Sequence, residues 1–303
     1  MIDIIFMGTP DYADVILQRL IDEREINVKA VYTQPDKPVG RKKILTPPPV
    51  KTTALKYDIE VYQPQRLREE SVVSELLEIE CDYIVVAAYG QILSRAILDH
   101  APCINLHASI LPQYRGASPI QQTLLNGDKE TGVTAMLMEE GLDTGDIIKI
   151  EKILVPDDMM LEALFERLTQ VAADLTLDVV KHFKEYTPLP QDEAHATYCK
   201  KITKADGLVR FDNAKTLLNK YRAFTPWPGI YLDSKLKLKE IALEETESSN
   251  NPAEILSVDK ESIVVGCLEG SVRIFRVQPE SKKEMDVLAY INGKRLRVAD
   301  YLS

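Results

Sequence analysis

Short apolar runs that alternate with amphipathic segments dominate the first half of the chain, and they limit the folds that it can adopt. Ile2–Met7, Val28–Thr33 and Asp82–Ala88 are such runs, each about as long as one strand. Largely apolar runs of this length are typical of strands that are buried on both faces of a parallel sheet. Because helical segments lie between them, they predict a Rossmann-like α/β fold with a mostly parallel sheet.

The length of 303 residues suggests two domains. We expect a Rossmann-like catalytic domain over residues 1–187, which a helix from Met159 to about Tyr186 completes. A linker over residues 188–204 is indicated by two prolines in a polar run. Short strands with turn signals between them then predict a smaller, OB-like β-barrel over residues 205–303.

Several classes of protein are disfavoured by the composition. No apolar run is long enough to cross a bilayer. The turn after the first run, Gly8-Thr9-Pro10, has one glycine and lacks the Gly-x-Gly-x-x-Gly pattern of dinucleotide-binding sites. The four cysteines show no Cys-x-x-Cys pair, so neither a disulfide framework nor a zinc site is expected, and a reducing cytoplasm fits.

The charge is unevenly distributed along the chain. The net charge of −10 argues against a general affinity for nucleic acid. Residues 205–303 contain as many basic as acidic side chains, so the net negative charge lies in the first 204 residues. This C-terminal third could therefore present a basic face, although scattered lysines on solvated strand edges are the plainer interpretation.

A polar pair follows the apolar start of a further strand. Asn105 and His107 come directly after Cys103-Ile104, and side chains two apart on a strand point to the same side. Ligands of α/β proteins bind at the ends of parallel strands. Alternatively, Asn105 caps a turn and His107 is a buried, hydrogen-bonded histidine. This alternative is weakened by the proline-bounded loop that follows, residues 108–119, because it would have to explain the Asn, the His and the loop together.

The same residues carry a resemblance to a known family. Residues 105–116 read Asn-x-His-x-Ser-x-Leu-Pro-x-Tyr-Arg-Gly, and residues 142–145 read Leu-Asp-Thr-Gly. Both segments, in this order and at this spacing, resemble the folate-dependent formyltransferases, which move a formyl group from 10-formyltetrahydrofolate to an amine. The resemblance covers nearly the whole chain, and it implies that Asn105, His107 and Asp143 are the catalytic residues. The chemistry of formyl transfer by such a trio needs no metal.

The resemblance also indicates where folate binds. In the family, the segment that matches Tyr89-Gly90 helps to hold the pterin ring, and a glycine at a strand end lets a ligand approach the backbone. For Tyr89 alone, a simple strand-to-helix turn is nearly as good an explanation. The remaining expected folate contacts lie in the motif itself: Ser109, Ile110, Leu111 and Pro112.

Residues 34–49 form a long, proline-rich segment with a basic tip, Arg41-Lys42-Lys43. Loops of this length are usually functional or mobile, and clustered cations suit phosphates. The segment resembles an insertion found in family members that formylate methionine on initiator tRNA, where it contacts the RNA. The tip is one residue shorter than is usual there, so which of the three side chains contacts RNA stays open. A mobile surface loop is the alternative.

The chemistry of formyl transfer suits the three expected catalytic residues. Attack of an amine on the formyl carbon places negative charge on the formyl oxygen, and a fixed N–H donor such as the Asn105 amide lowers that barrier. The amine must also lose a proton and the leaving nitrogen must gain one. An imidazole ordinarily exchanges protons near neutral pH. Asp143 could stabilise the imidazolium or take the proton itself, and the sequence leaves these two roles open.

The resemblance thus implies transfer of the formyl group to the α-amine of methionine on initiator Met-tRNA, for translation initiation. The expected partners are initiator Met-tRNA and folate, with no membrane, and a monomer is expected. One alternative is a formyltransferase that acts on an amino sugar nucleotide, which would not need the basic loop. A non-enzymatic RNA-binding module is another, and it would leave the polar triad without a purpose.

Overall fold

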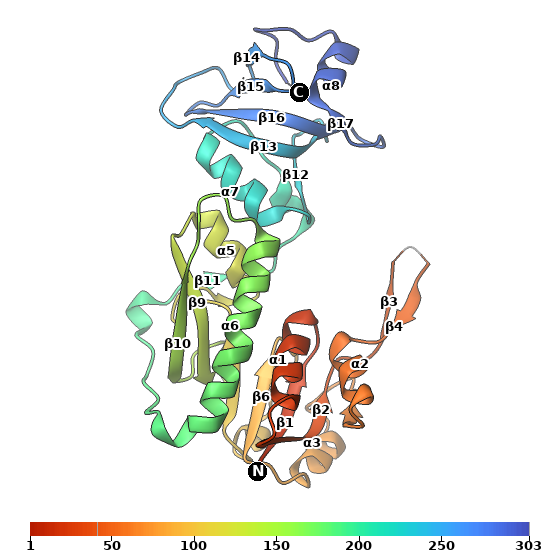
Figure 1. Ribbon diagram of the computed structural model, residues 1–303, viewed down its shortest axis with the longest axis vertical. Coiled ribbons are helices and arrows are strands. Elements are labelled where there is room, and N and C mark those ends of the chain that lie inside the picture. Colours follow the sequence, from red (N-terminus) through yellow and green to blue (C-terminus); the bar gives the residue numbers. More distant parts are fainter. Residues whose placement is uncertain (41, 303) are drawn as a thin grey trace. The chain divides into compact units, whose positions relative to one another are not determined.

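The computed structural model describes residues 1–40 and 42–302. They divide into two compact units, whose elements are labelled in Figure 1. The first unit comprises Met1–Pro119, Glu130–Leu154 and Phe165–Cys199. The second comprises Ile120–Lys129, Val155–Leu164 and the chain from Lys200 onward.

A seven-stranded sheet with strand order β10-β9-β7-β6-β1-β2-β5 forms the centre of the first unit. Neighbouring strands from β7 to β5 are parallel. At one edge of the sheet, β9 is antiparallel to β7, and β10 is antiparallel to β9. The expected mostly parallel, Rossmann-like sheet is therefore confirmed. The strands are β1 (Ile2–Gly8), β2 (Ile26–Tyr32), β5 (Glu60–Tyr62), β6 (Tyr83–Ala87), β7 (Cys103–His107), β9 (Glu130–Leu137) and β10 (Ile147–Leu154).

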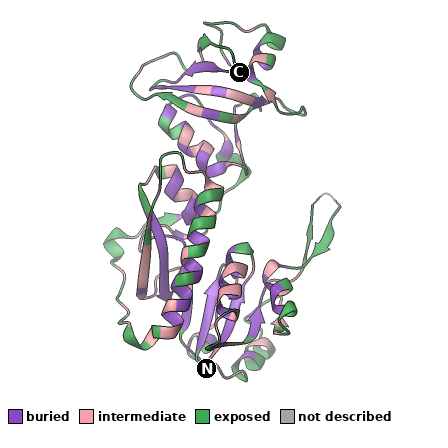
Figure 2. Cartoon of the chain, in the orientation of Figure 1, coloured by how far each residue is buried: buried purple, intermediate pink, exposed green. Residues whose placement is uncertain are grey.

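The central strands β1, β6 and β7 are mostly buried, because helices accompany the sheet (Figure 2). In β1, Ile4, Ile5, Phe6 and Met7 are all fully buried, as the continuous apolar run predicts. Helix α1 turns one apolar face inward, with buried side chains at helical spacing. The helices in the first half of the chain are α1 (Asp11–Ile21), α2 (Pro49–Lys56), α3 (Glu70–Leu77), α4 (Arg95–Leu98) and α5 (Pro119–Asn126).

A long helix, α6 (Leu161–His182), follows β10 and is continued by a 3₁₀ turn, η1 (Phe183–Glu185). The sequence predicts one helix from Met159 to about Tyr186. The observed helix begins two residues later, at Leu161, and its last turn is a 3₁₀ turn. Beyond it lie the short 3₁₀ helix η2 (Glu193–His195) and the strand β11 (Tyr198–Cys199). β11 pairs in parallel with β8 (Arg115–Gly116), so residues of the expected linker are hydrogen-bonded to the motif loop.

The proline-rich segment of residues 34–49 is more regular than the loop that the sequence suggested. β3 (Lys37–Val39) and β4 (Ile44–Thr46) pair antiparallel and form a hairpin that extends away from the sheet (Figure 1). Pro38 is tolerated because each strand of a two-stranded ribbon has an edge with no partner strand, where a missing N–H costs nothing. The side chains of Val39, Ile44 and Leu45 are 56%, 62% and 64% exposed.

The second unit contains an antiparallel sheet of short strands with order β12-β13-β16-β15-β14, and β17 pairs with β16. This confirms the expected second, β-rich domain after the Rossmann-like one. Asn213 caps α7 (Ala214–Phe224) by accepting a 2.8 Å hydrogen bond from Thr216 N, whereas α8 (Val287–Lys294) was not expected. The strands are β12 (Ile230–Tyr231), β13 (Lys237–Glu245), β14 (Ile255–Val258), β15 (Ile263–Gly266), β16 (Ser271–Gln278) and β17 (Met285–Asp286).

Within residues 1–40 and 42–302, no helix combines the length and the apolar character that crossing a membrane requires. The same residues contain no cluster of three or more His, Cys, Asp or Glu side chains arranged to hold a metal ion.

The thiols should be unreactive in the folded protein. Burial raises the pKa of Cys81 to about 11 and those of Cys103 and Cys267 to about 12, and it also raises the pKa of Cys199. Because the thiolate is the nucleophile, about a thousandth or less of the first three is reactive at pH 8. We expect labelling by a disulfide reagent at pH 8 to take hours natively and to be complete within seconds in denaturant.

The denatured sample is the control, since it should release four thiols per chain. Rapid labelling of any thiol in the native protein, at a rate similar to that in denaturant, would contradict the burial that the structure gives to these side chains.

Candidate active site

β7 places Asn105 and His107 near the end of the strand, on one face. Asn105 lies opposite Val86 of β6, and His107 lies opposite Thr134 of β9. His107 is buried, with 6% of its surface exposed, whereas Asn105 is half-buried. In the part of the chain that the structure describes, the Asn105 side-chain amide has no hydrogen-bond partner. It is therefore available to a ligand without breaking a protein contact.

The loop between β9 and β10 brings Asp143 to His107. The distance from Asp143 Oδ2 to His107 Nδ1 is 3.7 Å, and the two side chains are 15% and 7% exposed. Asp143 Oδ2 also accepts a 2.8 Å hydrogen bond from the backbone N–H of Gly116. The turn is tight, because a Cβ on Gly145 would lie 1.7 Å from the carbonyl oxygen of Leu137. The backbone of Asp143 itself is left-handed, with φ of 54°.

The hydrogen bonds of His107 define which ring nitrogen is available. Nε2 lies 2.9 Å from the carbonyl oxygen of Tyr114, and a carbonyl only accepts, so Nε2 carries the hydrogen. In the neutral ring, Nδ1 then has a lone pair that faces the Asp143 carboxylate. The structure thus brings the two expected acid–base residues together.

The four expected folate contacts in the motif form a loop that is fastened to β9. The Ser109 hydroxyl is buried and donates to the carbonyl of Gln113 at 2.6 Å. Thr134 Oγ1 donates to the Ser109 carbonyl at 2.7 Å and accepts from Leu111 N at 3.1 Å. Ile110 and Pro112 are half-buried. The sequence does not single out Thr134, because β9 contains a second threonine, Thr131, with the same hydroxyl.

Tyr89 and Gly90 lie just beyond the end of β6. The Tyr89 side chain is 2% exposed and packs in the core, so its ring does not face solvent. Its carbonyl accepts hydrogen bonds from Thr9 Oγ1 and Gln34 Nε2, both at 3.2 Å. Gly90 is exposed and has a φ of 79°, and a Cβ there would meet only Gln34, at 3.9 Å. An incoming group can therefore reach the backbone here.

The expected RNA contacts lie elsewhere in the first unit. Lys42 and Lys43 are exposed at the tip of the β3–β4 hairpin, and Lys43 N donates to the carbonyl of Gly40 at 3.2 Å. Arg41 lies outside the described residues. Among the described residues, the structure shows no contact between this tip and the group formed by Asn105, His107 and Asp143.

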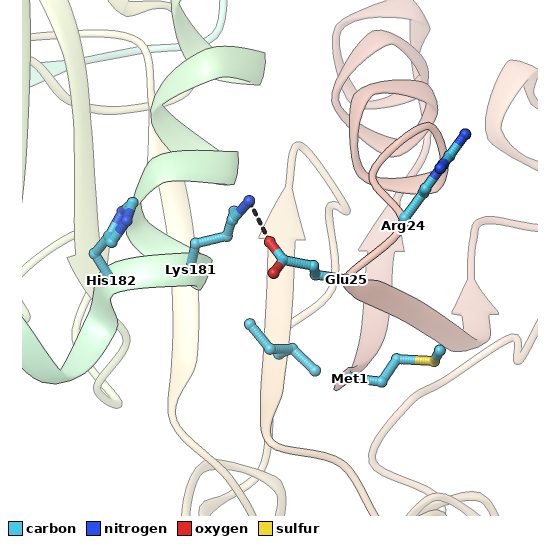
Figure 3. A pocket seen from close by; sticks show the side chains of 6 residues that line it. Met1, Arg24, Glu25, Lys181 and His182 are labelled. Carbon is cyan, nitrogen blue, oxygen red and sulfur yellow. Dashed lines mark ion pairs between the residues drawn. The ribbon is translucent and has the colours of Figure 1, made fainter.

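A surface pocket at the opposite end of the parallel strands is a poor candidate for an active site (Figure 3). It lies at the start of β1, whereas Asn105 and His107 lie at the end of the parallel strand β7. One of its cations, Lys181, is paired with Glu25 and lies 3.5 Å from Glu23, so Lys181 is not free to bind an anion. The lining residues are Met1, Ile2, Arg24, Glu25, Lys181 and His182.

An amide, an imidazole and a carboxylate lie together at one strand end of this Rossmann-like domain. Such a group of side chains is typical of enzymes that use acid–base chemistry. Comparison with known families agrees and is more specific. The model described as "Formyl transferase" matches residues 2–180, and the model described as "Formyl transferase, C-terminal domain" matches residues 201–295. The chain therefore belongs to the formyl transferase family.

Two relatives that match the chain over almost its whole length have the same name. A methionyl-tRNA formyltransferase from Sulfurimonas denitrificans is 66% identical over 300 residues, which cover 99% of each chain. A second, from Nitratiruptor sp., is 54% identical and covers 98% of each chain. Among solved structures, an N-formyltransferase from Helicobacter canadensis in complex with folinic acid and dTDP-3-aminofucose has the same fold. Its TM-score is 0.70 at 17% identity, over 92% of this chain and 100% of that one.

Proposed function

We propose that the protein transfers the formyl group of 10-formyltetrahydrofolate to the α-amine of methionine on initiator Met-tRNA. The observation that carries this proposal is the 66% identity with a methionyl-tRNA formyltransferase, because it runs through both family domains. The amino-sugar acceptor has weaker support, since the solved N-formyltransferase that was crystallised with such a compound is 17% identical. Formylation of the initiator would serve translation initiation, and the protein would act as a monomer in the cytoplasm.

Asn105 is proposed to stabilise the charge that develops on the formyl oxygen. Its amide is half-buried and carries no hydrogen bond from the described residues, so the N–H can point at the substrate. A donor that is already in place costs no reorganisation when the oxygen becomes negative, and such donors contribute about 2.7–4 kcal/mol to catalysis.

His107 and Asp143 are proposed to move the proton. As the bond between the α-amine and the formyl carbon forms, Nδ1 of His107 accepts the proton that the amine loses. Asp143, 3.7 Å away, stabilises the imidazolium. As the bond between the formyl carbon and the folate nitrogen breaks, the same proton goes to that nitrogen. His107 thus returns to its starting state, and no covalent enzyme intermediate is needed.

The folate is proposed to bind along the two loops that follow β6 and β7. Exposed backbone at Gly90 offers hydrogen bonds to the edge of a pterin ring. Ile110 and Pro112, which are half-buried, would supply apolar surface for its face. Leu111 is only 2% exposed, so it would support the loop from the core and not touch the ring. Ser109 shapes the loop through its bond to Gln113. Because the Tyr89 ring is in the core, Tyr89 would contribute through its main chain.

The tRNA is proposed to contact the basic segment Arg41-Lys42-Lys43 and the domain of residues 205–303. The tip concentrates cations in an otherwise acidic domain. The C-terminal domain carries no net charge, so it would not repel RNA as the first 204 residues would. Residues 1–187 would then supply the chemistry, and residues 205–303 would supply part of the RNA-binding surface.

The proposed function is tested by measuring formyl transfer from 10-formyltetrahydrofolate to three acceptors: Met-tRNA, uncharged initiator tRNA and a dTDP-amino sugar. We expect turnover with Met-tRNA alone. Formylation of the sugar nucleotide, with none of Met-tRNA, would overturn the proposal in favour of the alternative acceptor.

The contribution of the hairpin tip is separable from the chemistry. Replacement of Arg41, Lys42 and Lys43 by Ala should remove up to about three phosphate contacts, and the slope of log K against log salt should fall by up to about three. The effect should appear in kcat/KM for Met-tRNA, measured at several salt concentrations, while folate affinity stays unchanged.

The control is Lys184→Ala, which removes an exposed lysine of η1. The neighbouring Phe183 packs against Tyr83 at the start of β6, away from the hairpin. Lys184→Ala should leave the salt slope unaltered. A triple variant with the wild-type salt slope and KM would exclude the tip from RNA binding.

A further inference from the structure

Residues 189–199, here called the strap, lie along the motif loop. At one end, Leu189 exchanges backbone hydrogen bonds with Ile147 of β10, at 2.8 and 2.9 Å. At the other end, Thr197 pairs with both sides of the loop: its N–H donates to Pro112 O at 3.2 Å, and its carbonyl accepts from Arg115 N at 2.9 Å. The strap is therefore part of the first unit and is held at both ends beside the candidate active site.

Within the strap, Gln191 joins the two loops of the site. Its Nε2 donates to the carbonyl oxygens of Asp143 and Gly145, both at 2.8 Å. Its Oε1 accepts from Arg115, at 3.1 Å from Nε and 2.8 Å from Nη2. The orientation of this amide is unambiguous, because a guanidinium only donates and a carbonyl only accepts.

Arg115 fixes the position of Gln191. Its side chain is 0% exposed, and its remaining donors reach Glu193, at 3.0 Å from Nη1 and 2.7 Å from Nη2. The Tyr198 hydroxyl lies 3.3 Å from Nη1. A buried guanidinium has to keep such partners, since leaving it unpaired costs several kcal/mol. Gln191 consequently has one orientation open to it.

The backbone that Gln191 holds is the backbone that aims the Asp143 carboxylate. Asp143 is left-handed at φ of 54°, a conformation that costs free energy in residues other than glycine and persists where the surroundings enforce it. Its carboxylate is held from the other side by Gly116 N. Arg115 thus lies between Tyr114, whose carbonyl binds His107, and Gly116, whose N–H binds Asp143. The Arg115 side chain supports the Asp143 loop a second time, through Gln191.

We propose that Gln191 is a positioning residue for the Asp143 carboxylate, held in place by Arg115. The inference rests on the proposed function, because it assigns a second layer of support to the same site. Gln191 acts on the loop main chain and not on the substrates. It should therefore affect the rate of the chemical step and leave the affinity for folate and Met-tRNA unaltered.

Gln191→Glu separates this role from a purely structural one. The carboxylate keeps and strengthens the contact with Arg115, but it loses both donors and sets its charge against the carbonyls of Asp143 and Gly145. We expect kcat to fall about tenfold to a hundredfold, the cost of misplacing a catalytic group by about 1 Å, with KM for both substrates within about twofold of wild type. Gln191→Leu, which removes all four hydrogen bonds, should lower kcat at least as much.

Gln65→Glu is the matched control, because Gln65 is exposed in the same unit and the substitution adds the same charge. Melting temperature and folate binding report whether each variant is folded. If Gln191 merely partnered Arg115, Gln191→Glu would turn over at the wild-type rate, and that result would overturn the inference. A wild-type enzyme that fails to formylate Met-tRNA would instead count against the proposed function. The same variants would then be compared on the acceptor that the wild type does formylate.

Discussion

Asn105→Ala should lower kcat for formyl transfer by about a hundredfold or more, with KM for folate and Met-tRNA nearly unchanged. The expected loss is that of one preorganised oxyanion donor. In the ground state the formyl oxygen is a weak acceptor, so the amide contributes little to binding. Its hydrogen bond strengthens as the oxygen becomes negative, and only such interactions raise kcat. Steady-state kinetics with varied folate and varied Met-tRNA measure the two effects separately.

Asn105→Asp makes the same test without changing the size of the side chain. An ionised carboxylate only accepts hydrogen bonds, and it would place negative charge beside the oxygen that becomes negative. We therefore expect Asn105→Asp to be at least as damaging as Asn105→Ala. Asn292→Ala, at an exposed asparagine of α8, is the control and should turn over normally. Near-normal kcat in folded Asn105→Ala protein would remove Asn105 from the mechanism.

His107→Ala and Asp143→Asn should each lower kcat by about a hundredfold to ten-thousandfold, the range of general acid–base catalysis. In Asp143→Asn, the side chain keeps its shape and can still accept from Gly116 N. It loses the charge that stabilises protonated Nδ1 of His107, 3.7 Å away. The loss should therefore fall on the chemical step, which single-turnover measurements isolate.

The double variant reports whether the pair acts as a unit. If Nδ1 takes the proton because the carboxylate faces it, either single substitution removes most of the benefit. His107→Ala/Asp143→Asn should then be little worse than the more damaged single variant. An effect equal to the product of the two single effects would mean that His107 and Asp143 act independently.

The Rossmann-like sheet followed from local sequence patterns. The buried run of β1 needs no tertiary information, because a strand with no polar alternation is stable only where both faces are covered. The pairing of Asn105 with His107 on one face is likewise a consequence of strand periodicity. The proposed acid–base role of Asp143 rests on the resemblance to the family, since no periodicity connects residues that far apart in the chain.

The hairpin and the strap were not visible in the sequence. The prolines of the hairpin segment argue against strands, because a proline in a strand with a partner on each side removes a ladder hydrogen bond. In a two-stranded ribbon each strand has one free edge, and a proline can be accommodated there. Residues 188–204 have the composition of a linker, yet the strap pairs with a loop about 80 residues earlier in the chain. Such pairing depends on main-chain hydrogen bonds, which every residue type can make and which therefore leave no signature in the sequence.

The sequence by itself determined the parallel strands of the first sheet, the polar residue types of the motif and the presence of a second, β-rich domain. Only the tertiary structure decided that Arg115 is buried. Arginine is ordinarily exposed, and its burial here depends on Gln191 and Glu193, which the strap brings within 2.7–3.1 Å. Local interactions act through neighbours that the sequence specifies, whereas the partners of a buried charge are known only when distant segments have packed together.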